Sequence, residues 1–440
     1  MNTSHDNSKR QQAAAEHPAA AASGRAQAAA SLPERLIEEL NQGRCLSNTA
    51  PQSIQEVMPN YPEYRFAGGL DWLEWSIAVR WSADVFQELF SELEEVRQEC
   101  QDSKVPEKLH YLYGSLPVFV HRMGKTRGGT RGRHYPFVIT LGGIQCLIGN
   151  WQPGEGLPDN FVVCLTGRDC LLWGAWQCRE LVHAAIAKLG GEPVGEKVSR
   201  VDFCLDIDGL STRLVQELVE SRHYISRFKQ VRPYSNLVDD SKTGFEAGKR
   251  PQRLIVYDKI KQIRPKNDRE YVQALIQYRY GGNCPGQATR VEIQLGREVL
   301  RKFGIGQPAD IPLHGPSALR RILTEGFRVV DRPIPPGTKN HSRAEIHPLW
   351  TSIIEAFEKC FGEPGPPPPP LDRSEMSPDQ LIKQGFGCFR NAALQKRIPI
   401  ARFSDFLTVC SKLIREVFDS DEKQEEFVEK YQFGLTEHTQ

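Results

Sequence analysis

Apolar and polar residues alternate in several segments in the middle of the chain, and this alternation restricts the fold more than any other feature. The clearest case is the segment 75–81, where large apolar residues alternate with polar or small ones: Trp75, Ile77, Val79 and Trp81. A period of two is typical of a strand with one buried face. Similar short strands, separated by Gly, Pro and Asn residues, are expected at 111–120, 135–140, 145–150 and 161–166. We expect them to form an antiparallel meander.

Helical spacing occurs between and after these strands. Apolar residues recur every three or four positions in two long segments, 83–99 and 176–189. Shorter helices are expected around 214–219 and 268–280. The predicted fold class is α+β, with antiparallel sheets and segregated helices.

Composition divides the chain into four parts. Residues 1–67 begin with a segment rich in Ala, Ser and Gln, so we expect a mostly disordered N-terminal tail. Residues 68–330 carry the strand and helix patterns and are expected to form the main domain. Residues 331–371 are Pro-rich and include the run Pro366–Pro370, which favours an extended linker. Residues 372–440 are expected to form a small all-α C-terminal module.

Charge and cysteine content exclude several classes of protein. The chain has 56 Lys and Arg residues against 55 Asp and Glu residues, so affinity for nucleic acid must be local. Its 11 cysteines include no C-x-x-C pair, which favours reduced thiols in a cytoplasmic protein. The most apolar stretch, 161–176, is shorter than the ~20 residues that cross a bilayer. We therefore expect no membrane span, and the N-terminus lacks the apolar core of a secretory signal.

Two segments of the main domain repeat one order of Arg, apolar, acidic and apolar residues: 200–205 and 290–295. The repeat is consistent with two related halves. In the first segment and its continuation, the buried row is expected to be Val201, Phe203, Leu205 and Ile207. The opposite row carries Cys204 and the charged residues Arg200, Asp202, Asp206 and Asp208.

Carboxylates in such a row repel one another unless a cation lies over them. Mg²⁺ or Mn²⁺ suits this role because such ions take one or two protein carboxylates and keep several waters. Glu292, in the second segment, is a natural further ligand. The strand pattern therefore predicts a metal site built from Asp202, Asp206 and Glu292.

A third strand, 253–259, adds a phenol to this set. By alternation, Tyr257 shares a face with Arg253 and Lys259. If this face meets the acidic row, the combination suits phosphodiester chemistry. The phenol oxygen attacks in line, a metal ion polarises the phosphate, and the two basic side chains neutralise the developing charge.

The chain resembles the replication initiation factor family, the trans-acting rolling-circle initiators of plasmids and filamentous phages. Four motifs carry the resemblance, which covers about 68–304: Arg200-Val201-Asp202 with Asp206, Thr243-Gly244-Phe245, Tyr257-Asp258-Lys259 and Arg290-Val291-Glu292. The resemblance implies a Mg²⁺- or Mn²⁺-dependent DNA nickase and strand transferase that acts as a homodimer at an origin hairpin, with host replication proteins as candidate partners. It implies Tyr257 as the nucleophile that stays linked to the 5′ phosphate, Asp202 and Glu292 as metal ligands, and Lys259 as the phosphate-side cation.

One position departs from the family pattern. The family has Arg two residues before the tyrosine, where this chain has Ile255. Arg253 lies two residues further back on the same face and is the candidate substitute.

Local basic patches are candidates for DNA contact. The segment 122–134 carries basic residues and no acidic one, interleaved with glycines: Arg122, Lys125, Arg127, Arg131 and Arg133. It is expected to be a flexible loop that follows a phosphate backbone. Arg200 and Arg290 of the strand motifs are further candidates.

Three other interpretations stay open on the sequence alone. The departure at Ile255 fits a sequence-specific DNA-binding protein that shares the fold but does not cleave. A metal-dependent nuclease that activates water would need no tyrosine. Each motif taken singly also has a structural explanation, since Arg and acidic residues pair across sheets and Tyr is common in strands.

Overall fold

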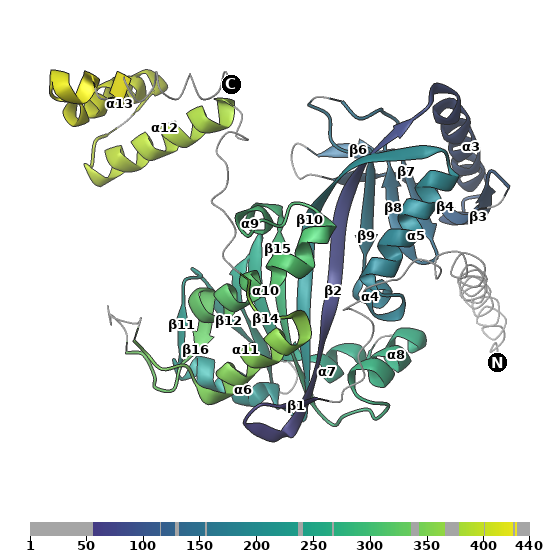
Figure 1. Cartoon of the computed structure of the whole chain (residues 1–440), viewed down its shortest axis with the longest axis horizontal. Helices are drawn as coiled ribbons and strands as arrows, with labels where there is room; N and C mark the ends of the chain where they lie inside the picture. Colours follow the sequence, from purple (N-terminus) through teal and green to yellow (C-terminus); the bar gives the residue numbers. More distant parts are fainter. Residues whose placement is uncertain are drawn as a thin grey trace, which may run out of the picture. The chain divides into compact units, whose positions relative to one another are not determined.

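A 12-stranded antiparallel sheet organises the main body of the chain in the computed structural model, among the residues that are described (Figure 1). The structure describes residues 56–114, 116–127, 132–154, 156–235, 241–265, 268–335, 343–365, 378–399, 401–425 and 427–428. The chain divides into two units, residues 1–369 and 370–440, and the sheet belongs to the first.

The first half of the sheet is built by residues 56–188. Its strands are β1 (Glu56–Met58), β2 (Tyr61–Trp81), β3 (Glu107–Leu112), β4 (Leu116–His121), β7 (Phe137–Leu141), β8 (Ile144–Ile148) and β9 (Phe161–Leu165). Its helices are α3 (Ala83–Asp102), α4 (Gly167–Leu172) and α5 (Ala175–Lys188). A separate two-stranded hairpin joins β5 (Lys125–Arg127) to β6 (Arg133–Tyr135).

The second half follows from residue 191. Its sheet strands are β10 (Gly191–Asp208), β12 (Val231–Ser235), β13 (Lys242–Lys249), β14 (Gln252–Asp258) and β15 (Ala288–Gly296). Its helices are α6 (Thr212–Glu220), α7 (Lys259–Ile263), α8 (Arg269–Arg279), α9 (Arg297–Lys302), α10 (Ile311–Arg321) and α11 (Pro348–Phe361), with a 3₁₀ turn η2 (Pro308–Asp310) and a π-helical turn η3 (Ile322–Gly326). A small second pairing joins β11 (Tyr224–Ser226) to β16 (Phe327–Val329).

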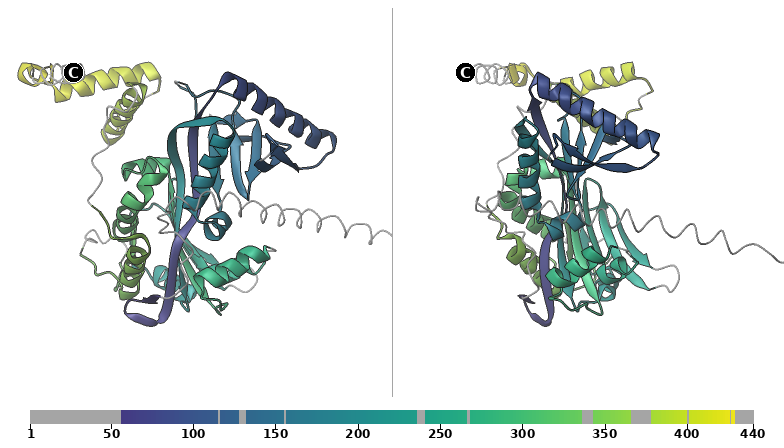
Figure 2. Two further views of the ribbon diagram at one scale, coloured as in Figure 1. Left: turned by 45° about the vertical axis from the view of Figure 1, so that its right-hand side comes forward. Right: turned by 90° about the vertical axis from the view of Figure 1, so that its right-hand side faces the viewer.

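The two halves repeat one topology. In each, a long strand is followed by a helix and a meander whose last strand returns to pair with the first, β9 with β2 and β15 with β10. The halves join where β2, in purple in Figure 2, pairs with β10. The predicted α+β class is confirmed. The repeated sequence pattern has a different origin, because 200–205 and 290–295 are the partnered strands β10 and β15 of one half.

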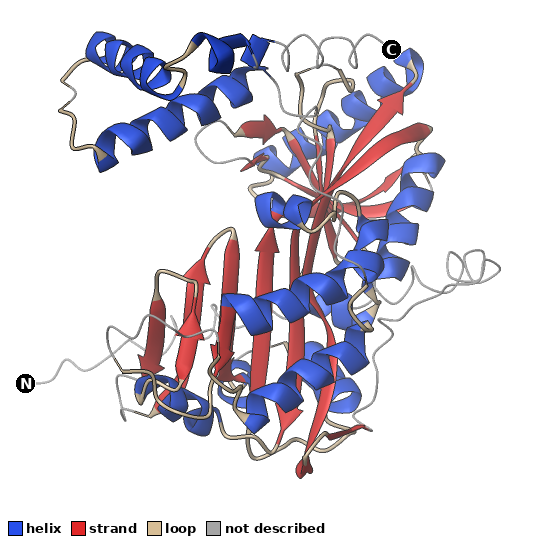
Figure 3. Cartoon of the chain, turned by 60° about the vertical axis from the view of Figure 1, so that its left-hand side comes forward, coloured by secondary structure: helices blue, strands red, loops and turns tan. Residues whose placement is uncertain are grey.

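One face of the sheet is buried by helices, as Figure 3 shows for the helices that lie across the strands. Its apolar rows include Trp75, Ile77, Phe203 and Leu205. The ring of Phe203 meets that of Phe361 edge-on at 5.3 Å, which places α11 on this face. Burial of each such side chain stabilises the fold by about 1.5–3 kcal/mol. Because these residues come from β2 and β10, their burial stabilises the junction of the two halves.

The long helices form where their spacing predicts. α3 begins after Ser82, whose side-chain oxygen accepts a hydrogen bond of 3.4 Å from the backbone N–H of Val85. Its apolar residues Leu89, Leu93 and Val96 lie three or four positions apart and are all buried.

The opposite face of the sheet is polar in its middle. At one end it is covered by α4, α7 and α8, which pack around Leu171, Ile260 and Tyr271. At the other end, the hairpin residue Tyr135 packs with Trp151 and Val162. Between these covered ends lie the charged residues of β10, β14 and β15.

Two domain boundaries differ from the sequence-based expectation. Strand β2 begins at Tyr61, ahead of the expected start at residue 68, and Phe66 and Ala67 are buried. The region 331–371 is not simply a linker, because it contains α11, whose Trp350, Ile353 and Phe357 are buried in the core. The Pro-rich context concealed this helix, in which Pro348 takes a first-turn position that needs no N–H donor. Residues 1–55 and the run 366–370 lie outside the described residues.

The described residues of the C-terminal unit include the helices α12 (Pro378–Gln395) and α13 (Phe403–Val417), and residues 421–425 are also helical. Phe386 of α12 lies 5.8 Å from Phe406 of α13, measured between ring centroids. Helices are therefore present in the segment expected to be an all-α module. In the part of the chain that the structure describes, no helix has the length and apolar character needed to span a membrane.

Candidate active site

Three adjacent strands bring most of the predicted site residues to the polar face. Three rows cross β14, β15 and β10 in that order: Tyr257–Arg290–Asp206, Ile255–Glu292–Cys204 and Arg253–Gln294–Asp202. Residues that lie directly opposite in a sheet share a face. The register therefore places Tyr257, Glu292 and Asp202 on one side of the sheet, in adjacent rows.

Tyr257 and Glu292 are in direct contact. The Tyr257 hydroxyl donates a hydrogen bond of 2.9 Å to Oε2 of Glu292, and the Gln294 side chain donates one of 2.7 Å to Oε1. Burial raises the pKa of the Tyr257 phenol well above its ordinary value; Arg290 opposes the rise and Glu292 adds to it. The phenol is therefore neutral, and Glu292 is placed to accept its proton.

Asp202 is a buried carboxylate held by one arginine. Arg200 donates hydrogen bonds of 2.9 and 2.5 Å to its two oxygens. Burial nevertheless raises the pKa of Asp202 to about 7; Arg200 lowers it, and Glu292 and Asp71 raise it further. The guanidinium of Arg200 also stacks on Trp72 at 4.6 Å. Burial and the acidic neighbours therefore affect the pKa of Asp202 more than its single arginine partner does.

Asp206 and Arg290 form a closed ion pair in the same face. Arg290 donates hydrogen bonds of 2.7 and 2.6 Å to the two oxygens of Asp206 and one of 2.5 Å to Asp71. Both members of the pair are fully buried beneath α8, and Arg279 of that helix also faces Asp206. This arrangement differs from the expectation of a metal ligand at Asp206 and a DNA contact at Arg290, because the two side chains form an ion pair with each other.

Lys259 lies behind Tyr257 rather than on the open surface. It begins α7, where the preceding Asp258 caps the helix through a 3.0 Å hydrogen bond from the N–H of Lys261. The Lys259 ammonium lies 5.8 Å from the ring centre of Tyr257 and 5.6 Å from that of Tyr271. Burial, with Arg290, lowers its pKa to about 8. The structure thus places this cation against the rings of two tyrosines.

Arg253 is oriented by two neighbouring strands. It donates a hydrogen bond of 3.2 Å to the hydroxyl of Tyr234 and forms an ion pair with Glu246. Ile255, between Arg253 and Tyr257, lies directly opposite Glu292. The structure therefore puts no cation at position 255, and Arg253 lies one row farther from Glu292.

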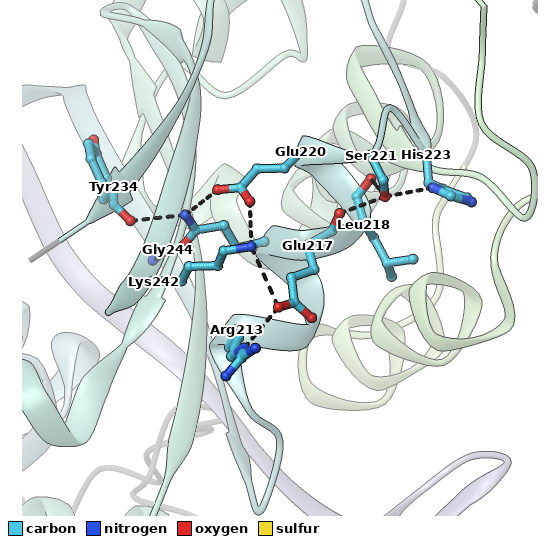
Figure 4. Close-up of polar contacts among 10 residues, drawn as sticks. Arg213, Glu217, Leu218, Glu220, Ser221, His223, Tyr234, Lys242 and Gly244 are labelled. Carbon is cyan, nitrogen blue, oxygen red and sulfur yellow. Dashed lines mark hydrogen bonds and ion pairs between the residues drawn. The ribbon is translucent and has the colours of Figure 1, made fainter. Parts of the chain in front are cut away.

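Helix α6 makes polar contacts with the neighbouring strands, as Figure 4 shows for Tyr234, Lys242 and Gly244. Gly244 of β13 lies opposite Tyr257 with φ of +138°, and a Cβ there would overlap the backbone of Val256. The buried amide of Gln216 accepts a 2.8 Å hydrogen bond from Gly244 N–H and donates one of 3.0 Å to the carbonyl of Tyr234. Lys242 binds Glu220 of the same helix at 2.5 Å. The helix therefore sets the position of β13, which in turn packs against the tyrosine strand.

A cleft of about 870 Å³ opens directly beside this site. Its wall includes Arg200, Gln294 and Arg253, each of which contacts or neighbours a site residue. Basic residues dominate the lining: Lys125, Arg127, Lys197, Arg200, Arg250, Arg253 and Arg297. Its acidic residues are Glu74 and Asp159. The excess of basic residues gives the local positive field that the neutral total charge conceals.

The segment expected to be a basic loop is partly the β5–β6 hairpin. Lys125 and Arg127 line the cleft, and Arg127 pairs with Glu74. Arg133 stacks on Trp151 at 4.5 Å, and Arg122 is partly exposed outside the cleft lining. Arg131 lies outside the described residues.

The donor set fits a hard divalent cation in part. Asp202 and Glu292 supply buried carboxylate oxygens in adjacent rows, which suits Mg²⁺ or Mn²⁺ with water and phosphate completing the shell. Asp206 fits less well, since it is fully buried and the fully buried Arg290 takes both of its oxygens. Arg200 likewise bonds both oxygens of Asp202, but Arg200 lines the cleft. Among the described residues, no group of three or more His, Cys, Asp or Glu side chains is arranged to hold a metal ion.

Several residues near the site were not found from the sequence. Gln294 lies two positions from Glu292, so strand alternation could have identified it. Asp71 and Trp72 lie on β2 at an irregularity in its pairing with β10. No local sequence pattern predicts this irregularity. Arg250 and Arg297 lie just outside the strands, and Gln216 reaches the site from a helix.

Comparison with solved structures finds matching chains. A solved structure described as a rolling circle replication initiator protein from Geobacillus stearothermophilus aligns with 68% of this chain and 98% of its own. The sequence identity is 14% and the TM-score is 0.35, which is too low to carry an argument about fold or function. No protein-family model matches the chain, and no curated protein matches it.

Proposed function

We propose that the chain is a metal-dependent DNA nickase and strand transferase that acts through Tyr257 and initiates rolling-circle replication at an origin in the cytoplasm. The observation that carries this proposal is the 2.9 Å hydrogen bond from the Tyr257 hydroxyl to Glu292, on a face shared with Asp202 and bordered by a basic cleft. The order of the strand motifs along the chain supports the role in replication.

The chemistry follows from the groups at this face. The Tyr257 oxygen attacks the phosphorus of one DNA strand, and its proton passes to Oε2 of Glu292, which already accepts the hydrogen bond. The bond from phosphorus to the 3′ oxygen breaks, so that the 5′ phosphate stays on Tyr257. The 3′ oxygen takes a proton from water and is left as a hydroxyl that can prime synthesis.

Asp202 and Glu292 are the residues that would hold Mg²⁺ or Mn²⁺. The ion would polarise the phosphate and stabilise developing negative charge on the leaving oxygen. Arg200 orients Asp202 through two hydrogen bonds, and Gln294 orients Glu292. Lys259 lies against the Tyr257 ring, and Arg290 opposes the rise in the pKa of the phenol.

The test is formation of a covalent protein–DNA adduct. Purified protein with Mg²⁺ or Mn²⁺ and single-stranded origin hairpins should give a species that survives denaturing electrophoresis, and Tyr257→Phe should give none. Tyr280→Phe is a matched control, because the Tyr280 hydroxyl is buried and has no hydrogen-bond partner among the described residues. Absence of adduct across a broad hairpin panel, or cleavage that leaves no adduct, would contradict the proposal.

One observation favours a second function, sequence-specific DNA binding without cleavage. Ile255 faces Glu292, and Arg253 is held by Glu246 and Tyr234, so the cation expected beside the phenol is displaced by one row. Under this function, wild-type protein would bind origin DNA without cutting it, and Tyr257→Phe would bind equally well.

A further inference from the structure

We propose that the cleft beside Tyr257 binds the single-stranded flank of the DNA, with Lys125, Arg250 and Arg297 as its phosphate contacts. The inference rests on the proposed nickase function for its choice of DNA, and it assigns a separate binding surface. None of these three residues belongs to the hydrogen-bonded group around Tyr257, Glu292 and Asp202.

The basic residues of the cleft fall into two sets. Four are already bound to carboxylates of the protein: Arg127 to Glu74, Lys197 to Asp159, Arg200 to Asp202 and Arg253 to Glu246. The other three have no carboxylate partner among the described residues: Lys125, Arg250 and Arg297. The first set fixes the shape of the cleft, and the second set is open to an external anion.

The contacts of these three cations support that division. Lys125 donates a hydrogen bond of 2.7 Å to the neutral Gln145, and Arg297 donates one of 3.0 Å to the carbonyl of Val198. Burial and the neighbouring Arg301 lower the pKa of Arg297; Asp159 opposes this shift but forms its ion pair with Lys197. Arg250 is exposed at the turn between β13 and β14. DNA phosphates in the cleft would give each of these three cations an anionic partner.

The position of the cleft fits a strand that continues from the reacting phosphate. Arg253, in its wall, lies four residues from Tyr257 along β14 and is separated from it by one row of the sheet. With a rise of ~3.3 Å per residue, Arg253 and Tyr257 are roughly 13 Å apart along the strand. This distance corresponds to a few nucleotides of DNA. A strand cut at Tyr257 therefore reaches the cleft within its next nucleotides.

The size and lining of the cleft favour one strand over two. Its volume of about 870 Å³ lies within the ~300–1,000 Å³ of pockets that hold a small ligand, which suits a few nucleotides of one strand better than a duplex. Arg200 presents a guanidinium plane stacked on Trp72 at 4.6 Å. Bases of single strands stack on arginine planes and aromatic rings, whereas the bases of a duplex are already stacked on one another.

The test compares two triple variants with the same change in charge. Lys125→Gln/Arg250→Gln/Arg297→Gln removes the three open cations, and Lys188→Gln/Lys229→Gln/Lys302→Gln removes three exposed lysines outside the cleft lining. Binding of a fluorescein-labelled oligo-dT of ~12 nucleotides, within the ~4–16 of single-strand binding folds, is measured by anisotropy at several salt concentrations. A duplex of equal length is measured in parallel.

We expect the cleft triple to bind the single strand at least tenfold more weakly than wild type, and the control triple to change affinity by less than threefold. The slope of log K against log salt should fall in magnitude by about 2 for the cleft triple, because each phosphate contact on a single strand contributes ~0.7. The exposed pair Lys125→Gln/Arg250→Gln repeats the test if the Arg297 change impairs folding. Equal losses in the two triples, or duplex binding that depends on the three cations as strongly, would overturn the inference.

The outcomes also separate this inference from the nickase proposal. If wild type forms no adduct with any DNA but holds oligo-dT through the three cations, the nickase fails and the cleft assignment stands. If the adduct forms and the cleft triple binds like the control triple, the cleft assignment fails alone.

Discussion

Two charged clusters share the polar face of the sheet, and they differ in how their charges are satisfied. At the end covered by α8, Arg290 is shared by Asp206 and Asp71 and is closed off from solvent. Glu292 lies one row away and Asp202 two rows away, and Arg200, the partner of Asp202, lines the cleft. In the first cluster Arg290 is shared by two carboxylates, and in the second Arg200 binds Asp202 while Glu292 has only the neutral partners Tyr257 and Gln294. The second cluster, which borders the cleft, is therefore the one to which we assign the proposed metal ion.

The two clusters have opposite acid–base behaviour. Burial disfavours the charge on Asp71, but Arg290 and Lys259 outweigh it and lower its pKa to about 2. Burial raises the pKa of Asp202 to about 7 despite Arg200. Ionised Asp71 therefore stabilises the fold, and ionised Asp202 destabilises it.

The largest expected effect comes from breaking the closed cluster. Arg290→Met removes the hydrogen-bonded partner of the buried Asp206 and of the half-buried Asp71, and leaves Asp206 only the 3.9 Å contact with Arg279. We therefore expect the free energy of unfolding to fall by about 3–5 kcal/mol in urea titrations. Arg200→Met is the matched control in the open cluster. It should lose less, because Asp202 can take up a proton near neutral pH. Equal losses from the two substitutions would remove the distinction between the clusters.

A second prediction uses the pH dependence of the open cluster. The folded pKa of Asp202 lies above its unfolded value, so its destabilising effect grows as pH rises from about 4 to about 7 and is complete above 7. Asp202→Asn removes this effect. We expect the variant to gain stability relative to wild type, by a few kcal/mol at most, at pH 8 and to gain little at pH 4.

The closed cluster supplies the contrast for that measurement. Ionised Asp71 contributes stability that is present above about pH 4 and is lost as pH falls through about 2. Asp71→Asn should therefore lose stability at pH 8, where Asp202→Asn gains it. The same sign for both variants at pH 8 would contradict the account.

The smallest expected effect is stabilisation by the metal ion itself. Mn²⁺ at about ten times its dissociation constant should stabilise wild type by about 1.4 kcal/mol through mass action. Asp202→Asn and Glu292→Gln should lose this stabilisation in thermal denaturation, and Asp206→Asn should keep it at whatever stability that variant has. A shift that survives in the first two variants would place the metal elsewhere.

The sequence predicted which face each residue occupies, but not which residues are paired. Alternation along β10, β14 and β15 is enough to put Tyr257, Asp202 and Glu292 on polar rows. The register is a non-local property. It sets Arg290 opposite Asp206 and so converts an expected metal ligand into half of an ion pair.

Helix packing was similarly hidden from local patterns. The spacing of apolar residues predicts the helix α8. It does not predict that Arg279 and Tyr271 of this helix cover one end of the sheet. α11 is amphipathic, but it lies in a Pro-rich region whose composition favoured a linker. These features depend on which surfaces meet after folding, so they could not be read from any one segment.

The most direct test of the account is to locate the DNA-linked residue. The adduct formed with Mn²⁺ and a hairpin oligonucleotide can be digested with nuclease and trypsin and its peptides analysed by mass spectrometry. We expect a nucleotide attached through phosphate to Tyr257, in wild type and in Tyr280→Phe alike. Attachment to any other residue, or a cut strand with a free 5′ phosphate, would contradict it.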